Sequence, residues 1–496
     1  MKIGFVYPEM ETLGIQYISS VLKQNGHQTK LFFDPLFFMD TVTRIGFLGK
    51  RLDYSDKLIS DLKKYDPGLV AFSVLSVNYE WACSLAKKIK NRMKVPIVFG
   101  GIHPTAMPQE VMKNDFVDMA VCGEGEYAML ELAECGIEKR FFPGIKNLCY
   151  KDSGRCFCNP LRELVQDLDG LPFPDKGLFY GLMPYLSKNY TMITSRGCPH
   201  NCAYCCNGFL NKLYKGRYLR RRSVGNVIAE LAWAKEKYGM KCVFFDDSTL
   251  TYDLPWLSDL AREYKSKIGL PCFCWVYPTD INLKLISQLK TLNCKAVEMG
   301  VESLDEKVRS GLFRRFYDNA DIENAIKLFN ENKIFCVVDN IKGYCKDPEE
   351  EMRGMVRFYN QNRPKKIYIF EHRYFPKTEL SEMLELEKKG EVQRMLPFTI
   401  TTAATPGVVK QLEFLAILIY ALPKSWIELL LNKRIYRFFP PISSYNILEI
   451  FPFFLNSLKM KKNRFWYPIR GTRRRYLHFI LQNPLYFFRR LIKLWE

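Results

Sequence analysis

The sequence lacks a hydrophobic run long enough to cross a membrane. The nearest run, Phe414–Leu422, falls well short of the roughly 20 apolar residues that a spanning helix needs. The first apolar stretch, Ile3–Tyr7, is too short for the core of a secretory signal peptide. Without such a signal, the 16 cysteines among 496 residues argue against a secreted disulfide scaffold. We therefore expect a cytoplasmic protein of two or three domains.

Acidic residues are scarce at the end of the chain. Residues 424–496 contain 15 Lys or Arg, three Glu, no Asp and 17 aromatic residues, so they carry +12 of the chain's net +20. This composition is typical of basic helices that either pack on the rest of the protein or lie on an anionic membrane surface, which would place the protein on the inner face of the membrane. Binding to RNA is the least favoured of the three alternatives.

Three cysteines stand close together in the segment Thr194–Cys205, which reads TSRGCPHNCAYC. A C-x2-C pair alone would fit zinc or a redox-active pair. The thiolates of Cys198, Cys202 and Cys205 can bind three corners of one [4Fe–4S] cube and leave the fourth iron open, whereas iron–sulfur electron carriers close their cluster with four cysteines. An open coordination site indicates catalysis. We interpret the adjacent Cys206 as a packed neighbour.

With Tyr204 before its last cysteine, this motif resembles the signature of the radical S-adenosylmethionine (SAM) superfamily. The resemblance implies that SAM binds the open iron and that one electron from the reduced cluster cleaves a carbon–sulfur bond. The resulting 5′-deoxyadenosyl radical then abstracts hydrogen from an unactivated carbon. An electron donor such as flavodoxin or ferredoxin is also implied. A zinc site or a closed cluster is the alternative.

The first 147 residues alternate between strand and helix patterns, with helices expected at Leu13–Gln24 and Glu80–Arg92. This alternation predicts a Rossmann-like, doubly wound parallel sheet. Its ligands would bind at the carboxyl ends of the strands. The expected strands are Ile3–Tyr7, Thr29–Phe33, Leu69–Phe72, Ile97–Phe99 and Met119–Val121.

Glycine-rich segments follow two of these strands, at Gly100-Gly101 and at Gly123–Glu126. Together with Gly14 after the first strand, they resemble the cobalamin-binding domain of radical SAM enzymes. The resemblance implies that the following residues contact cobalamin: Gly14, Gly100, Gly101, His103, Gly123, Glu124, Gly125 and Glu126. Glycine there lets backbone approach a large flat ligand. The Asp-x-His-x-x-Gly motif of many cobalamin domains is absent, so no lower axial ligand is assigned, and His103 is not given that role. A domain without cofactor, or one whose pocket takes substrate, is the alternative.

Residues 148–190 lose the alternating pattern. A hairpin with its turn at residues 152–154 is expected first, and a proline-rich, irregular linker follows. Cys149, Cys156 and Cys158 could ligate an extra cluster, but no fourth ligand is apparent nearby. We therefore interpret them as packed thiols.

Residues 191–375 repeat a strand–helix unit six times, which predicts a partial (β/α)6 barrel. The cluster loop follows its first strand, at the C-terminal mouth where barrel active sites lie. The expected helices include Val224–Lys237, Asn282–Leu292 and Ile322–Asn330. The expected strands are Met192–Thr194, Cys242–Phe245, Cys272–Trp275, Ala296–Met299, Ile334–Val338 and Lys366–Phe370.

Polar residues at the ends of three barrel strands resemble the SAM-binding segments of the family. They are Asp246, Asp247, Glu302, Ser303 and Gly343, and the resemblance also implies that Tyr204 of the cysteine motif contacts SAM. A carboxylate suits a ribose diol or an ammonium group, although an Asp pair after a strand is more often a helix cap. Tyr277-Pro278 and Pro376-Lys377-Thr378 depart from the family pattern, which leaves the substrate open.

We thus expect an α/β enzyme with a cobalamin-binding-type domain (1–147), a hairpin and linker (148–190), a radical SAM barrel (191–375) and a helical, basic C-terminal region (376–496). The resemblance implies a [4Fe–4S] cluster, SAM and cobalamin, used to methylate or otherwise modify an unactivated carbon of a small, hydrophobic or lipid-like substrate. The alternatives are an oxidative cyclase, an RNA-modifying radical enzyme, and a non-enzymatic iron–sulfur or cobalamin-binding protein.

Overall fold

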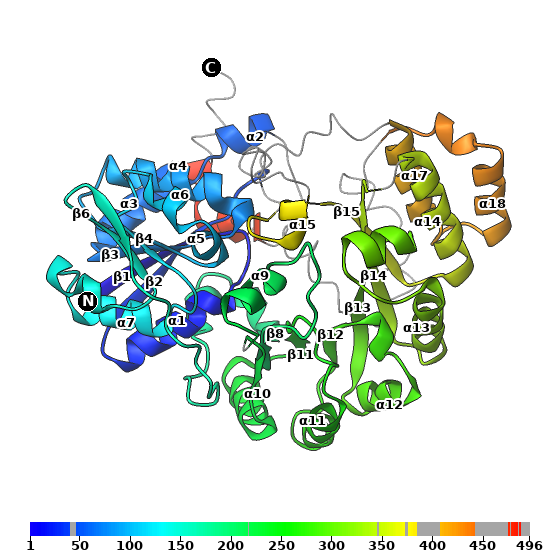
Figure 1. Cartoon of the computed structure of the whole chain (residues 1–496), viewed down its shortest axis with the longest axis horizontal. Helices are drawn as coiled ribbons and strands as arrows, with labels where there is room; N and C mark the ends of the chain where they lie inside the picture. The colour runs from blue at the N-terminus through cyan, green and yellow to red at the C-terminus, as the bar shows by residue number, and fades with distance from the viewer. Residues whose placement is uncertain are drawn as a thin grey trace.

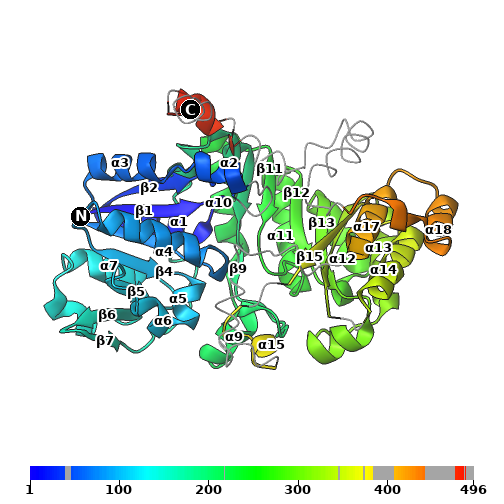
Figure 2. The same cartoon turned by 90° about the horizontal axis from the view of Figure 1, so that it is seen from above.

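Two α/β units lie side by side in the computed structural model, as both views show (Figures 1 and 2). The structure describes residues 1–39, 46–216, 218–344, 347–372, 375–383, 407–441, 475–476, 478–484 and 486–487. The N-terminal unit is drawn in blue and cyan, and the second unit in green and yellow.

The N-terminal unit contains a seven-stranded sheet of order β2-β1-β3-β4-β5-β6-β7. Its first five strands are parallel, which confirms the predicted Rossmann-like sheet. The chain order reverses between β1 and β3, and such switch points are where open α/β sheets bind ligands. The strands are β1 (Lys2–Pro8), β2 (Gln28–Asp34), β3 (Leu69–Ser73), β4 (Ile97–Gly100), β5 (Met119–Val121), β6 (Leu148–Asp152) and β7 (Arg155–Cys158). The helices are α1 (Leu13–Gln24), α2 (Gly46–Arg51), α3 (Ser55–Tyr65), α4 (Tyr79–Lys90), α5 (Ile102–Ala106), α6 (Pro108–Met112) and α7 (Glu126–Glu134), with the 3-10 turns η1 (Ser76–Asn78) and η2 (Lys139–Gly144).

The predicted hairpin is confirmed as β6 and β7, but it belongs to this sheet rather than to a linker. β6 pairs antiparallel with β5 because Leu148, Cys149 and Tyr150 are buried there. The interpretation of three packed thiols is wrong. Cys149 and Cys158 lie opposite each other in the ladder and form a disulfide, while Cys156 is exposed.

The second unit contains six parallel strands of order β15-β14-β13-β12-β11-β8, which confirms the partial (β/α)6 barrel. Its long helices form an outer arc around the strands (Figure 1). The strands are β8 (Asn189–Met192), β11 (Cys242–Phe245), β12 (Cys272–Val276), β13 (Cys294–Glu302), β14 (Phe335–Lys342) and β15 (Lys366–Glu371). The helices are α10 (Val224–Tyr238), α11 (Leu254–Lys267), α12 (Leu283–Thr291), α13 (Asn319–Glu331) and α14 (Pro348–Asn362).

The first barrel strand begins and ends earlier than predicted, at Asn189 and Met192. The chain leaves the ladder after Met192 because the backbone N–H of Thr194 donates to the Asp247 carboxylate. The shorter elements around the barrel are α8 (Gly177–Tyr180), η3 (Pro184–Lys188), β9 (Ser195–Arg196), α9 (Cys206–Leu213), β10 (Arg220–Arg221), η4 (Pro278–Asp280), η5 (Val308–Leu312) and α15 (Glu379–Met383).

The described part of the C-terminal region packs in two places. α17 (Gly407–Leu418) and α18 (Lys424–Asn432) lie against α14, and η6 (Ile435–Phe438) follows them. The described residues between 475 and 487 instead pack on the N-terminal unit, where Phe479 stacks on Phe33 with ring centroids 5.6 Å apart. Most of the predicted basic C-terminal region between residues 442 and 496 lies outside the described residues. Within the described ranges, no helix has the length and apolar character needed to cross a membrane.

Candidate functional site

The loop that carries the three cysteines is tied at its base to the end of β11. The buried Asp247 carboxylate accepts hydrogen bonds from the backbone N–H and hydroxyl of Thr194 and from the hydroxyl of Ser195, at 2.5–3.0 Å. Burial raises the pKa of Asp247, and these donors act in the opposite direction. Asp247, expected to contact SAM, therefore fixes the cluster loop.

Cys198, Cys202 and Cys205 are free thiols on the loop that leads from β8 to α9, at the carboxyl ends of the barrel strands. The middle of the loop is pinned on both sides. The backbone N–H of Ala203 donates to the carbonyl of Phe313 at 3.0 Å, and its carbonyl accepts from the N–H of Leu380 at 2.7 Å. Long-range backbone contacts thus hold the cysteines in place.

A buried arginine that the sequence did not single out lies beside these thiols. Nη1 of Arg315 is 3.4 Å from Sγ of Cys202 and donates to the Tyr204 hydroxyl at 3.2 Å. Tyr204 in turn donates to the Glu302 carboxylate at 2.8 Å. Arg315 is also 3.7 Å from Glu302 and stacks over the Tyr277 ring. Arg315 lies between η5 and α13, so it brings a guanidinium to the cluster loop from a different part of the chain.

The residues present fit an iron–sulfur cluster. Three unpaired thiols share one loop, and a guanidinium next to a cysteine sulfur stabilises the thiolate form that binds iron. Among the described residues, no three His, Cys, Asp or Glu side chains converge on a single metal ion. A cube needs no such convergence, because each thiolate binds a different iron.

A cavity of about 360 Å³ lies between the two units, at the β1/β3 switch point. Its walls come from the ends of β3, β4 and β5, from the start of α1 and from the cluster loop. The predicted residues that line it are Gly14, Gly100, Gly101, Gly123, Glu124, Gly125, Glu126, Asp246 and Asp247. A Cβ atom at Gly14 would meet no protein atom within 4 Å. A Cβ at Gly100 would meet protein atoms only at 3.8 Å or more, so the backbone at Gly14 and Gly100 is open to a large flat ligand such as cobalamin. At Gly101, Gly123 and Gly125 a Cβ would instead lie within 3.0 Å of protein atoms.

Other predicted residues do not line this cavity. The His103 ring is buried, packs against the Tyr79 ring and forms a hydrogen bond with Ser76, and burial lowers its pKa to about 4. Ser303 accepts the N–H of Asp305 and caps a turn. Gly343 adopts a φ of 97° and donates its N–H to Glu351. These three residues order loops in the structure.

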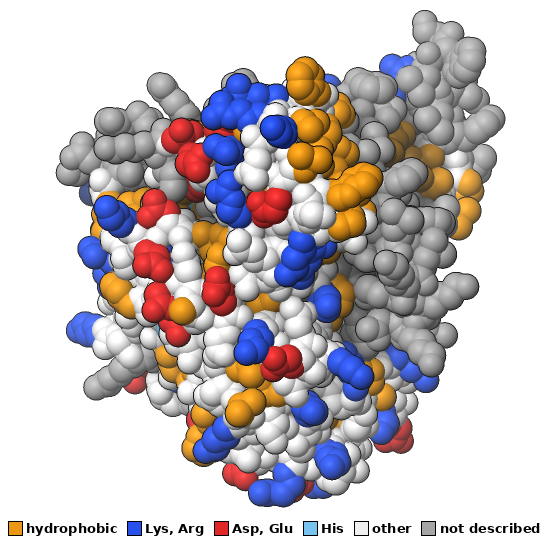
Figure 3. All heavy atoms as spheres, turned by 90° about the vertical axis from the view of Figure 1, so that its right-hand side faces the viewer, with side chains coloured by type: hydrophobic (Ala, Val, Ile, Leu, Met, Phe, Trp, Pro, Cys, Tyr) orange, Lys and Arg blue, Asp and Glu red, His pale blue; other side chains and the backbone are white. Residues whose placement is uncertain are grey.

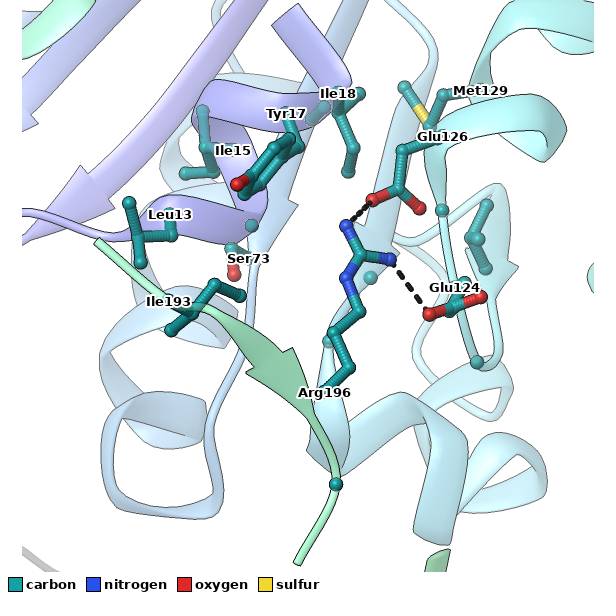
Figure 4. A pocket seen from close by; sticks show the side chains of 18 of the residues that line it. Leu13, Ile15, Tyr17, Ile18, Ser73, Glu124, Glu126, Met129, Ile193 and Arg196 are labelled. Atoms are coloured by element: carbon teal, nitrogen blue, oxygen red, sulfur yellow. Dashed lines mark hydrogen bonds and ion pairs between the residues drawn. The ribbon is translucent and has the colours of Figure 1, made fainter. Parts of the chain in front are cut away.

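One arginine of the cysteine motif connects the two units. Arg196 forms ion pairs with Glu124 at 2.7 Å and with Glu126 at 2.6 Å (Figure 4). Glu124 also pairs with Arg220 at 2.9 Å. Although burial opposes it, Arg220 and Arg196 hold the pKa of Glu124 below its ordinary value. Ion pairs therefore join the segment Gly123–Glu126, which reads Gly-Glu-Gly-Glu, to the cluster loop.

Carboxyl groups also gather at the barrel strands. The charges of Asp246 after β11 and of Glu302 on β13 both act on Glu298 of β13, so the three groups lie near one another. Burial raises the pKa of Glu298 to about 7, and burial together with Glu298 raises the pKa of Asp339 on β14 well above its ordinary value. Asp246, which accepts from Trp275 Nε1 at 3.3 Å, has its pKa raised by burial to about 6. The sequence analysis missed Glu298, Asp339 and Trp275.

Two family models match the two units. The B12 binding domain matches residues 3–133, and the Radical SAM superfamily matches residues 192–359. An uncharacterised methyltransferase of Pyrococcus horikoshii is 28% identical over 381 residues, which are 72% of this chain and 77% of the relative. An anaerobic magnesium-protoporphyrin IX monomethyl ester cyclase of Rubrivivax gelatinosus is 25% identical over 225 residues, 41% of this chain and 38% of that protein.

The same architecture occurs in a solved structure. The radical SAM methyltransferase TsrM of Kitasatospora setae, solved with tryptophan and a SAM analogue, superposes with a TM-score of 0.61 at 18% identity. The match covers 78% of this chain and 76% of TsrM. At this identity the likeness concerns the fold alone.

Proposed function

We propose that this protein methylates an unactivated carbon of a hydrophobic, lipid-like substrate. The chain joins a B12-binding domain to a radical SAM domain and so belongs to the cobalamin-binding radical SAM enzymes. When bound, the cluster and SAM supply a carbon-centred radical, and cobalamin supplies a methyl group. One observation carries the proposal: a single loop holds the three thiols and also forms a wall of the glycine-lined cavity through Arg196.

The chain's own residues would bind, orient and shield these groups. Cys198, Cys202 and Cys205 hold the cluster, and the guanidinium of Arg315 donates toward the Cys202 sulfur. The carboxyl groups of Asp246, Glu298 and Glu302 suit the sulfonium and ammonium charges of SAM, because carboxylates accept charge-assisted hydrogen bonds.

The lipid-like substrate is supported by the basic, aromatic C-terminal region and by the exposed apolar side chains of α18. Oxidative cyclisation is a second candidate, because one of the relatives is a cyclase. Flavodoxin or ferredoxin is the expected source of the electron.

The test uses full-length protein reconstituted anaerobically with iron, sulfide and methylcobalamin. With SAM, a low-potential reductant and a panel of hydrophobic acceptors, we expect 5′-deoxyadenosine and a product that is heavier by one methyl group, detected by mass spectrometry. A product that loses hydrogen without gaining carbon would favour cyclisation. Methylation of tRNA but of no hydrophobic acceptor would refute the proposed substrate class.

A further inference from the structure

The helix α18 and the following turn η6 expose large apolar side chains to solvent. Trp426 is 61% exposed, Leu429 is 52% exposed and Phe438 is 88% exposed. Trp426 and Leu429 are one helical turn apart, so they share a face of α18. In the view toward this side of the molecule, hydrophobic side chains gather next to Lys and Arg side chains (Figure 3). We call this region the α18–η6 surface.

The opposite side of α18 and η6 is firmly attached to the barrel. Ile427, Leu431 and Tyr436 are fully buried, and the Tyr436 hydroxyl donates to Glu349 of α14 at 2.6 Å. Asn360 of α14 donates to the carbonyl of Lys424 at 3.0 Å. The exposed side chains therefore project from an element that is fixed to α14.

The charge of the same segment is positive. Residues 424–441 contain four basic residues and one acidic residue. The acidic residue, Glu428, is held by Asn360, while Lys433 and Arg434 are exposed at the end of α18. Cations next to exposed Trp, Phe and Leu are typical of helices that lie in the headgroup region of an anionic bilayer.

We propose that the α18–η6 surface seats the enzyme on an anionic membrane surface. An aliphatic Leu429 within the patch favours a bilayer over RNA, because bases stack on aromatic rings and a leucine offers none. The basic, aromatic segment near the C-terminus, described at residues 475–476, 478–484 and 486–487, is less suited to this role. Its side chains Tyr476, Phe479 and Phe487 are buried against the N-terminal unit. The inference deepens the proposed function, because it places the enzyme where lipid-like substrates are found.

Membrane binding is tested by co-sedimentation of the full-length protein with vesicles of phosphatidylcholine and phosphatidylglycerol, and with vesicles of phosphatidylcholine alone. Each basic residue that is removed should weaken binding to the anionic vesicles about fivefold, so the variant Lys433→Ala/Arg434→Asn should bind them about 30-fold more weakly. Asn is chosen because position 434 has a φ of 52°, which Asn tolerates. Trp426→Ala/Phe438→Ala should lose at least about tenfold. The matched control is Leu283→Ala, which removes a side chain that is 72% exposed on α12 and should bind as the wild type does.

A second readout is specific to the site and independent of folding stability. Anionic vesicles should shift Trp fluorescence to the blue in the wild type, and Trp426→Phe should bind almost as well but lose that shift. Equal binding of all variants, equal loss in the Leu283 control, or binding of tRNA without binding of vesicles would overturn the proposal. Vesicle binding without methylation of any lipid-like acceptor would refute the proposed substrate while the membrane surface stands.

Discussion

Replacing Arg196 by methionine should destabilise the protein more than the loss of a surface charge would. The guanidinium is the ion-pair partner of Glu126, whose side chain is 5% exposed, and it shares Glu124 with Arg220. Glu124 keeps Arg220 in the variant, so the cost falls on Glu126. Leaving one member of a buried ion pair without its partner costs about 3–5 kcal/mol. That is a large part of the 5–15 kcal/mol that typically stabilises a folded protein.

Thermal unfolding of the cofactor-free protein provides the assay, and at about 2–4 °C per kcal/mol the midpoint should fall by about 6–20 °C. The double variant Arg196→Met/Glu126→Gln should recover most of this loss, because it removes the stranded charge together with its partner. Arg262→Met is the control, since its ion pair with Asp259 is exposed. If the two substitutions are additive within about 0.5 kcal/mol, the reasoning about this pair is refuted.

Three further predictions concern the cofactors and the buried acids. Cys198→Ala, Cys202→Ala and Cys205→Ala should each lose the expected content of about four irons and should form no 5′-deoxyadenosine. The neighbouring Cys206→Ala should keep its iron and still form 5′-deoxyadenosine. Retention of iron in all four variants would contradict the ligand set. Gly100→Leu should fold, because a Cβ there meets protein atoms only at 3.8 Å or more, but visible absorption should show that it takes up no cobalamin. Gly101→Leu should instead unfold the domain, since Gly101 has a φ of 103° and a Cβ there would lie 2.8 Å from the Val74 carbonyl. Normal cobalamin uptake by Gly100→Leu would place the ligand elsewhere. Because the pKa of Glu298 is raised to about 7, the folded wild type should bind one more proton than the unfolded chain between about pH 4.5 and 7. Its free energy of unfolding should therefore fall by up to about 3 kcal/mol relative to that of Glu298→Gln as the pH rises over this range. Denaturant titrations in which the wild type and Glu298→Gln show the same pH dependence would refute the shift.

The strands and the cluster motif could be predicted because their signals are local. The buried apolar runs of β1 to β5 and of β11 to β15 are bounded by turn residues, so their positions follow from a few neighbours. The hairpin was also found from its turn. Its place in the sheet was not, because pairing with β5 depends on a distant segment.

The support of the site could not be predicted in the same way. Arg315 reaches Cys202 across 113 positions, and Arg196 reaches Glu126 across 70. No spacing rule connects such residues. Arg196 was visible as part of the cysteine motif, but nothing local indicated its partners. The role of Asp247 could not be predicted either, because its buried carboxylate accepts hydrogen bonds from Thr194 and Ser195.

The contact between Arg196, Arg220 and the Gly-Glu-Gly-Glu segment bears on how such enzymes can be recombined. A domain that carries the buried Glu126 and the partly buried Glu124 at its edge is compatible only with a barrel that presents matching guanidinium groups. A chimera that joins this N-terminal unit to a foreign barrel would therefore need arginines at the positions of Arg196 and Arg220. Exchange of the two units as independent modules is restricted to pairs of proteins in which both halves of this contact are present.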